Sequence, residues 1–151
     1  MTEKVAAMAY WLLKTEPETF SWDDQVKRGA KGEPWSGVRN HQAKNNLMKM
    51  INGERAFFYH SGESKEIVGV VEVIREHYPD PTAKAGERSS ASWVVVDLKA
   101  IEPLKKPVKL ADAKAEPRLK SMVLVNNTRL SVQPISDAEW KVICKMGGVK
   151  E

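Results

Sequence analysis

Cysteine and histidine are scarce in this sequence. Cys144 is the only cysteine among the 151 residues, which excludes an intrachain disulfide and a cysteine-rich zinc site. The histidines are His41, His60 and His77, and no two of them stand at a paired ligand spacing such as HxxxH. The sequence therefore indicates no catalytic metal site. With so little cysteine, the reducing cytoplasm is the simplest compartment for the protein.

Other familiar catalytic and membrane signals are also missing. The sequence contains no GxSxG motif around a nucleophilic serine and no glycine-rich phosphate-binding loop. An apolar run, "VAAMAYWLL" at residues 5–13, is too short to span a bilayer. It is followed by "KTEPETF" and not by the small residues of a signal-peptide cleavage site. We therefore expect a soluble protein that does not bind membranes.

The composition is typical of one globular domain with a mildly basic surface. Hydrophobic residues make up 42% of the chain and charged residues 29%. The length of 151 residues favours a single domain, which we assign to residues 1–151. The net charge of +4 permits binding to nucleic acid but is too small to establish it.

Apolar periodicity and turn residues predict an α+β fold. Strands are expected at residues 8–14, 54–61, 66–76 and 92–104 and within 126–135, where β-branched and aromatic residues gather. Helices are expected at residues 21–29, 39–50, 109–117 and 136–148, with capping boxes at Ser21 and Ser136. The strands are joined by hairpins and meanders. This pattern indicates a mixed sheet that curls into a small barrel, not a doubly wound parallel sheet.

One pattern has the composition of an enzyme site. Asp80 ends "YPD", and Asp97 and Lys99 share one face of the strand "WVVVDLK", because side chains alternate along a strand. Two carboxylates and a lysine are the parts of the PD-(D/E)xK nuclease signature, in which the carboxylates hold Mg²⁺ and the lysine steadies a water. The signature is short and degenerate. We favour the alternative that Asp97 and Lys99 lie on the solvent-facing side of an amphipathic strand.

Basic and aromatic residues point toward nucleic acid more directly. Residues 35–53 and 118–136 contain lysine and arginine but no acid, and they would form one positive face if they met in space. Trp35 stands in a predicted loop, directly before the most polar helix start of the chain. An indole in such a loop is a natural stacking platform for a base. The free N–H groups of the helix start can bind an anion.

Several long segments occur in the order expected of the EVE-domain family. They are "YWLLKTEPETFSWDD", "WSGVRNHQAKNNLMKM", "FFYHSGESKEIVGVVEV", "YPDPTA", "WVVVDLK" and "TRLSVQPISDAEW". The sequence resembles this family from Tyr10 to about Cys144, so we place the domain core at about 9–146. The resemblance implies a PUA-like fold, a mixed β pseudo-barrel with short surrounding helices that is related to YTH and ASCH domains. It also implies a reader of modified bases without enzymatic activity, metal or organic cofactor.

The resemblance further implies which residues form the site. The pocket for the base would consist of Trp35, Ser36, Gly37, Val38, Asn40, Tyr59, His60, Ser61, Leu130, Ser131 and Gln133. The phosphate-binding residues would be Lys14, Arg39 and Arg129. Within this set, Trp35 would stack on the base, and Asn40 and Ser61 would contact its polar edge. The cations would make binding depend on salt.

The expected partner is DNA or RNA that carries a modified base, modified cytosine above all, bound by a monomer or weak dimer. Two alternatives remain. One is the Mg²⁺-dependent nuclease that uses Asp80, Asp97 and Lys99. The other is an interaction module whose pocket binds a small metabolite or a protein tail.

Overall fold

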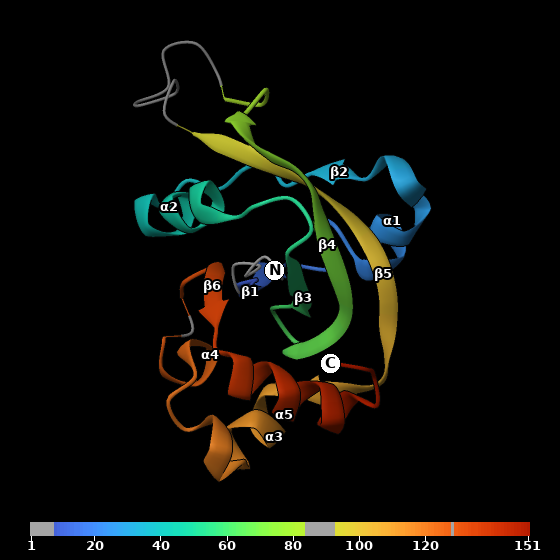
Figure 1. Cartoon of the computed structure of the whole chain (residues 1–151), viewed down its shortest axis with the longest axis vertical. Helices are drawn as coiled ribbons and strands as arrows, with labels where there is room; N and C mark the ends of the chain where they lie inside the picture. The colour runs from blue at the N-terminus through green and yellow to red at the C-terminus, as the bar shows by residue number, and fades with distance from the viewer. Residues whose placement is uncertain (1–7, 84–92, 128) are drawn as a thin grey trace, which may run out of the picture.

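The computed structural model describes residues 8–83, 93–127 and 129–151. Across these residues the centre of the molecule is a six-stranded sheet with the order β2-β5-β4-β3-β1-β6 (Figure 1). The strands are β1 (Tyr10–Thr15), β2 (Glu33–Pro34), β3 (Arg55–His60), β4 (Glu66–Pro79), β5 (Val94–Lys109) and β6 (Val132–Ile135). β1 pairs parallel with β3, and the other neighbouring pairs are antiparallel. The predicted α+β class with a mixed sheet is confirmed.

β4 and β5 form a long antiparallel ladder that curves as it crosses the molecule. The two strands have 14 and 16 residues, and their pairing shifts register at four places. Such irregularities bend a strand and increase its twist. In Figure 1 the ladder sweeps from the upper end of the molecule down to the C-terminal helices. β5 also continues to Lys109, five residues beyond the predicted end of this strand.

The sheet has a hydrophobic core on each face. Because side chains alternate along β1, Trp11 and Leu13 enter the first core and Leu12 enters the second. β3 repeats the pattern, since Phe58 lies in the first core and Phe57 in the second. α2 packs against the first core, and the helices near the C-terminus cover the second. The candidate site described below lies on the side of the first core.

Short helices surround the sheet. They are α1 (Trp22–Lys27), α2 (His41–Lys49), α3 (Leu110–Ala115), α4 (Val123–Asn126) and α5 (Asp137–Gly147), with 3₁₀ turns at Gly29–Lys31 and Pro117–Leu119. The predicted capping boxes at Ser21 and Ser136 are both present. α2 begins at His41, two residues later than predicted, because Asn40 is its N-cap. Within the described ranges, no helix is long and apolar enough to cross a membrane.

Candidate functional site

A cavity of about 440 Å³ lies where the end of β1, the residues around α1 and the segment from β2 to α2 come together. Its size falls in the range of small-molecule sites, roughly 300–1,000 Å³. It is lined by Lys14, Thr15, Thr19, Phe20, Arg28, Glu33, Pro34, Trp35, Ser36, Gly37, Val38, Arg39 and Ser131. The structure thus brings five of the eleven predicted pocket residues together, namely Trp35, Ser36, Gly37, Val38 and Ser131.

Trp35 forms part of the cavity wall and is more deeply buried than a loop setting suggests. Its backbone N–H donates to the carbonyl of Val96 at 2.8 Å, which extends the β2–β5 ladder by one residue. Its ring stands edge-on to Phe58 and to Phe20, with ring centroids 5.5 Å and 6.2 Å away. Only 7% of Trp35 is exposed. The indole is therefore a fixed wall and not a loose surface platform.

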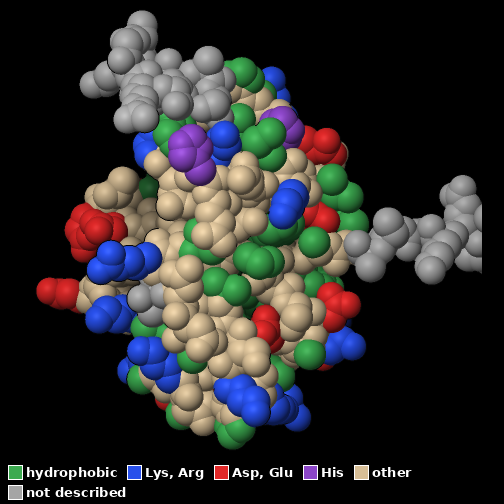
Figure 2. All heavy atoms as spheres, turned by 90° about the vertical axis from the view of Figure 1, so that its left-hand side faces the viewer, with side chains coloured by type: hydrophobic (Ala, Val, Ile, Leu, Met, Phe, Trp, Pro, Cys, Tyr) green, Lys and Arg blue, Asp and Glu red, His purple; other side chains and the backbone are tan. Residues whose placement is uncertain are grey.

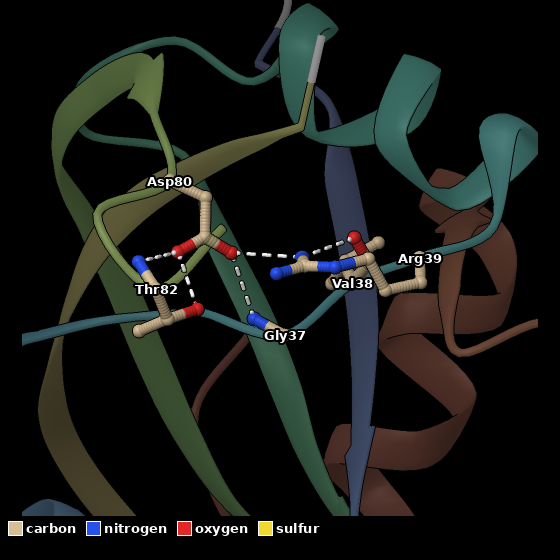
Figure 3. Close-up of polar contacts among 5 residues, drawn as sticks. All are labelled: Gly37, Val38, Arg39, Asp80 and Thr82. Carbon is tan, nitrogen blue, oxygen red and sulfur yellow. Dashed lines mark hydrogen bonds and ion pairs between the residues drawn. The ribbon is translucent and has the colours of Figure 1, made fainter. Parts of the chain in front are cut away.

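Asp80, immediately after β4, holds the neighbouring wall in place (Figure 3). Its Oδ2 accepts hydrogen bonds from the backbone N–H of Gly37 and from Nη1 of Arg39, each at 3.0 Å. Its Oδ1 accepts from the backbone N–H and the hydroxyl of Thr82, each at 2.7 Å. The side chain of Asp80 is 0% exposed. This one carboxylate fixes both the backbone of the wall and the direction of the Arg39 guanidinium.

The hydrogen bonds also set the charge state of Asp80. Burial alone would raise the pKa of Asp80, but the bonds from Gly37, Thr82 and Arg39 outweigh burial and hold this pKa below its usual value. The carboxylate is therefore ionised at neutral pH. The sequence suggests Asp80 only as a nuclease residue and gives no sign of its role as the organiser of the cavity wall.

The structure does not gather Asp80, Asp97 and Lys99 into one metal site. The N–H of Asp80 donates to the carbonyl of Trp93, so Asp80 lies four residues, or about 13 Å, from Asp97 along β5. Oδ1 of Asp97 accepts a hydrogen bond from the hydroxyl of Tyr78 at 2.5 Å. Asp97 and Lys99 are half-buried on one face of the strand, as the amphipathic interpretation predicts. Throughout the described residues, no three potential metal ligands lie together.

Among the described residues, three basic side chains line the cavity. Lys14 and Arg39 are two of the three predicted phosphate-binding residues, and the third basic lining residue, Arg28, was not predicted. Nε of Arg28 lies 2.6 Å from Oε1 of Glu33, which also lines the cavity. Burial lowers the pKa of Lys14. As far as the structure describes its lining, the cavity thus has a positive rim with one carboxylate in it.

The two acid-free basic segments, residues 35–53 and 118–136, do meet in space. α2 belongs to the first segment and β6 to the second, and Nδ2 of Asn46 donates to the carbonyl of Val132 at 2.7 Å. Figure 2 shows the side of the molecule that carries α2 and β6. Lysine and arginine side chains are scattered over it with acidic side chains between them, and several gather toward the end that carries α3. The face is basic in patches and is not one continuous positive surface.

Three predicted pocket residues have other contacts and do not line the cavity. Oδ1 of Asn40 accepts from the N–H of Ala43 at 2.9 Å, which caps α2. Tyr59 is 3% exposed and packs in the second core, and burial raises its pKa to about 12. Nε2 of His60 accepts from the N–H of Trp22 at 3.0 Å, so this nitrogen carries no proton. Alternation along β3 explains Tyr59, which faces away from Trp35.

The other four predicted residues outside the lining come from two segments. Ser61 donates its N–H to the carbonyl of Thr15 at 2.9 Å. Gln133 is 0% exposed, and its Nε2 donates to the carbonyl of Leu130 at 2.8 Å. Leu130 is buried in the first core, and Arg129 is exposed and does not line the cavity. Of the predicted site residues between 129 and 133, only Ser131 lines the cavity.

Six lining residues were not singled out in the sequence: Thr15, Thr19, Phe20, Arg28, Glu33 and Pro34. For one of them, the sequence contains a pattern that indicates its position. Glu33 stands two residues before Trp35 in an extended segment, so the two side chains lie on the same side of the backbone. Thr15 directly follows Lys14 and Pro34 directly precedes Trp35 in the sequence. Thr19, Phe20 and Arg28, in contrast, reach the cavity only through tertiary contacts.

Comparisons with known proteins agree with this architecture. The family model of the EVE domain matches residues 9–146. Thymocyte nuclear protein 1 of Homo sapiens is 32% identical over 165 residues, covering 91% of this chain and 73% of that protein. The NMR structure of a Rhodopseudomonas palustris protein is 58% identical with a TM-score of 0.86, covering 95% of this chain and 96% of the other.

Two further solved structures have a similar fold. The human THYN1 protein in complex with DNA containing 5-methylcytosine is 31% identical with a TM-score of 0.83, covering 95% of this chain and 99% of the other. A YTH domain of Zygosaccharomyces rouxii has a TM-score of 0.56 at 17% identity, covering 97% of this chain and 90% of the other, and so shares the fold. The PUA-like fold expected from the sequence is confirmed. With the family model matched across nearly its whole length, this chain belongs to the EVE-domain family.

Proposed function

We propose that this chain is a non-enzymatic nucleic-acid-binding protein that holds a modified base in the cavity, with modified cytosine as the preferred base. The observation that carries the proposal is the human relative in complex with 5-methylcytosine DNA, which aligns with 95% of this chain at 31% identity. A shared fold alone would not carry it, because one fold hosts many functions. The chemistry of the cavity supplies independent support.

The cavity offers the groups that a base and its phosphates require. Trp35 and Phe20 give flat apolar walls against which a base can stack. Lys14 and Arg39 give positive charge for phosphates, which makes binding weaken as salt increases. A base within a duplex must turn out of the stack to enter, at a cost of a few kcal/mol. Single-stranded or mispaired nucleic acid is therefore expected to bind better than a perfect duplex.

An affinity panel of short single-stranded DNA and RNA oligonucleotides, each with one modified base, tests the proposal at two salt concentrations. We expect the tightest binding to a strand with modified cytosine, and weaker binding of every strand at the higher salt. Equal affinity for modified and unmodified strands would contradict the reader function. Nucleic-acid binding that is absent at both salts would favour a small metabolite or a protein tail as the ligand.

Incubation with Mg²⁺ and plain or modified DNA tests the absence of enzymatic activity. We expect no cleavage, because Asp80 is engaged by Gly37, Thr82 and Arg39. Cleavage that disappears in Asp97→Ala would overturn the non-enzymatic proposal in favour of the nuclease.

A further inference from the structure

We propose that Glu33 is the residue by which the cavity distinguishes cytosine-type bases from thymine. The inference rests on the proposed function and names the base edge that the site reads. 5-Methylcytosine and thymine carry the same methyl group, but position 4 bears an amino group in cytosine and a carbonyl oxygen in thymine. A pocket that recognises only a flat ring and a methyl group binds both. A hydrogen-bond acceptor that faces position 4 selects the cytosine type, because it accepts from the amino group and is repelled by the carbonyl oxygen.

Glu33 has this chemistry. Among the described residues that line the cavity, it carries the only carboxylate. The three cations of the lining can only donate hydrogen bonds, and the serine and threonine hydroxyls can turn to donate or to accept. Hydroxyls therefore suit either base. A carboxylate accepts only, and acceptance from the cytosine amino group is a recurrent pairing of glutamate and aspartate in protein–DNA complexes.

The backbone places Glu33 on the side of β2 that faces the cavity. Glu33 pairs with Leu98, and Trp35 extends the same ladder through its bond to Val96. Residues two apart in an extended segment point to the same side, so the carboxylate and the indole share one face. Leu98 lies with Trp35 in the first core. A base held against the indole thus has the carboxylate of Glu33 on its own side of the strand.

Arg28 positions the carboxylate and leaves one oxygen available. Nε of Arg28 lies 2.6 Å from Oε1 of Glu33. Among the described residues, no other side chain donates a hydrogen bond to this carboxylate. Gly32 allows the backbone before Glu33 to lie close to β5. Its φ is +75°, and an added Cβ would lie 2.6 Å from the carbonyl oxygen of Leu98. Oε2 remains to accept from a base. Arg28 is a positioning residue and Glu33 a base-reading residue.

The test compares one variant with one matched control on four DNA strands. Glu33→Gln supplies a carboxamide, which can turn to accept from the amino group of cytosine or to donate to the carbonyl of thymine. Glu72→Gln removes the same charge from another half-buried glutamate, which is paired with Arg55 at 3.5 Å and lies outside the cavity lining. The probes are single strands identical except for one central cytosine, 5-methylcytosine, thymine or uracil. Ratios of affinities at one salt concentration cancel the general effect of a lost negative charge.

We expect wild-type protein and Glu72→Gln to prefer the 5-methylcytosine strand over the thymine strand by about tenfold or more, and Glu33→Gln to lower this ratio to about twofold. The ratio of the affinities for the 5-methylcytosine and cytosine strands is expected to differ by less than about twofold among the three proteins, because both bases carry the same amino group at position 4. A wild-type ratio in Glu33→Gln overturns the inference. Wild-type protein that binds 5-methylcytosine and thymine equally, and both above cytosine and uracil, also overturns it while leaving the proposed function intact. Wild-type protein with no preference among the four strands rejects the proposed function and the role of Glu33 with it.

Discussion

Oδ2 of Asp80 lies 3.0 Å from the backbone nitrogen of Gly37, and this contact joins the end of β4 to the wall of the cavity. The two residues are 43 positions apart in the chain. The same oxygen accepts from Arg39, which lines the cavity. The shape of the wall and the position of a positive charge at the cavity therefore depend on one buried carboxylate.

We expect Asp80→Asn to destabilise the fold. One carboxylate oxygen accepts the N–H of Gly37 and the other accepts the N–H of Thr82, so an asparagine in either orientation turns its NH₂ group toward a backbone donor. The ion pair with Arg39 is lost as well. The free energy of unfolding is expected to fall by about 2–3 kcal/mol, measured by urea denaturation. Asp112→Asn, at an exposed position of α3, is the control. An unchanged urea midpoint in Asp80→Asn would contradict the structural role of the Asp80 carboxylate.

Acid is expected to remove the same stabilisation. Burial would raise the pKa of Asp80, but the hydrogen bonds from Gly37, Thr82 and Arg39 hold this pKa below its usual value. The contribution to stability is thus present above the ordinary carboxyl pKa, about 4, and is lost as pH falls through the lower folded-state value. The difference in unfolding free energy between wild type and Asp80→Asn should therefore shrink from about pH 6 to about pH 3. A difference that is constant over this range would contradict the assignment.

Local patterns account for most of the fold. The hairpin of β3 and β4 joins two β-branched and aromatic runs across a short polar turn, and both capping boxes involve residues three apart. Each of these features depends on residues that are near one another in the sequence. The cavity differs, because Lys14, Trp35 and Ser131 become neighbours only in the folded chain. Periodicity cannot reveal such contacts, and a family resemblance identifies segments more reliably than side-chain directions.

Alternation along β3 explains why Tyr59 does not line the cavity. Phe58 and Tyr59 must face opposite sides of the sheet. Because Phe58 packs against Trp35, Tyr59 lies on the far side. Gln133 is placed in a similar way, since its neighbour Val132 lies in the first core and Gln133 does not line the cavity. A prediction that assigns consecutive strand residues to one pocket conflicts with this geometry.

His60 introduces a second pH dependence at a different pH. Its Nε2 accepts the N–H of Trp22 at 3.0 Å. Burial lowers the pKa of His60, against the opposing influence of Glu66, Asp23 and Glu18. Stability from a lowered pKa is present above the ordinary histidine value of about 6.5 and is lost as pH falls through the folded-state pKa. We therefore expect the unfolding free energy to decrease from about pH 7 to about pH 5.

His60→Gln tests this origin. A glutamine offers an amide oxygen to the N–H of Trp22 and does not titrate, so the loss of stability over the same pH range is expected to be smaller than in wild type. His77→Gln, at an exposed position of β4, should lose stability as the wild type does. Equal pH profiles for His60→Gln and His77→Gln would show that the bond to Trp22 does not cause the effect.

Asn40→Asp separates helix capping from base reading. Aspartate caps a helix as well as asparagine does and its charge suits a helix N-terminus, so α2 is expected to keep its stability. Asn40→Ala should lose about 1 kcal/mol, measured by thermal or urea unfolding. Because Asn40 does not line the cavity, Asn40→Asp is expected to retain the wild-type preference for the modified base. A clear loss of that preference would restore Asn40 to the site.

Trp35 requires a variant that separates recognition from stability. Trp35→Ala would cost roughly 3–5 kcal/mol, because a large side chain would be removed from the first core. Trp35→Phe keeps an aromatic ring and loses less packing, but it presents a smaller surface to a stacked base. We expect it to fold and to bind the 5-methylcytosine strand about tenfold more weakly, within the roughly 1–3 kcal/mol that base stacking contributes.

Trp140→Phe is the matched control for Trp35→Phe. Trp140 is 2% exposed and packs in the second core against Phe57, on the other face of the sheet. Both variants lose indole packing, so a general loss of stability would affect them alike. Only Trp35→Phe should lose affinity for the modified base, and its salt dependence should stay at the wild-type slope because Lys14 and Arg39 remain. An equal loss of affinity in both variants would mean that the effect arises from stability, and the wall of the cavity would then not be the stacking surface.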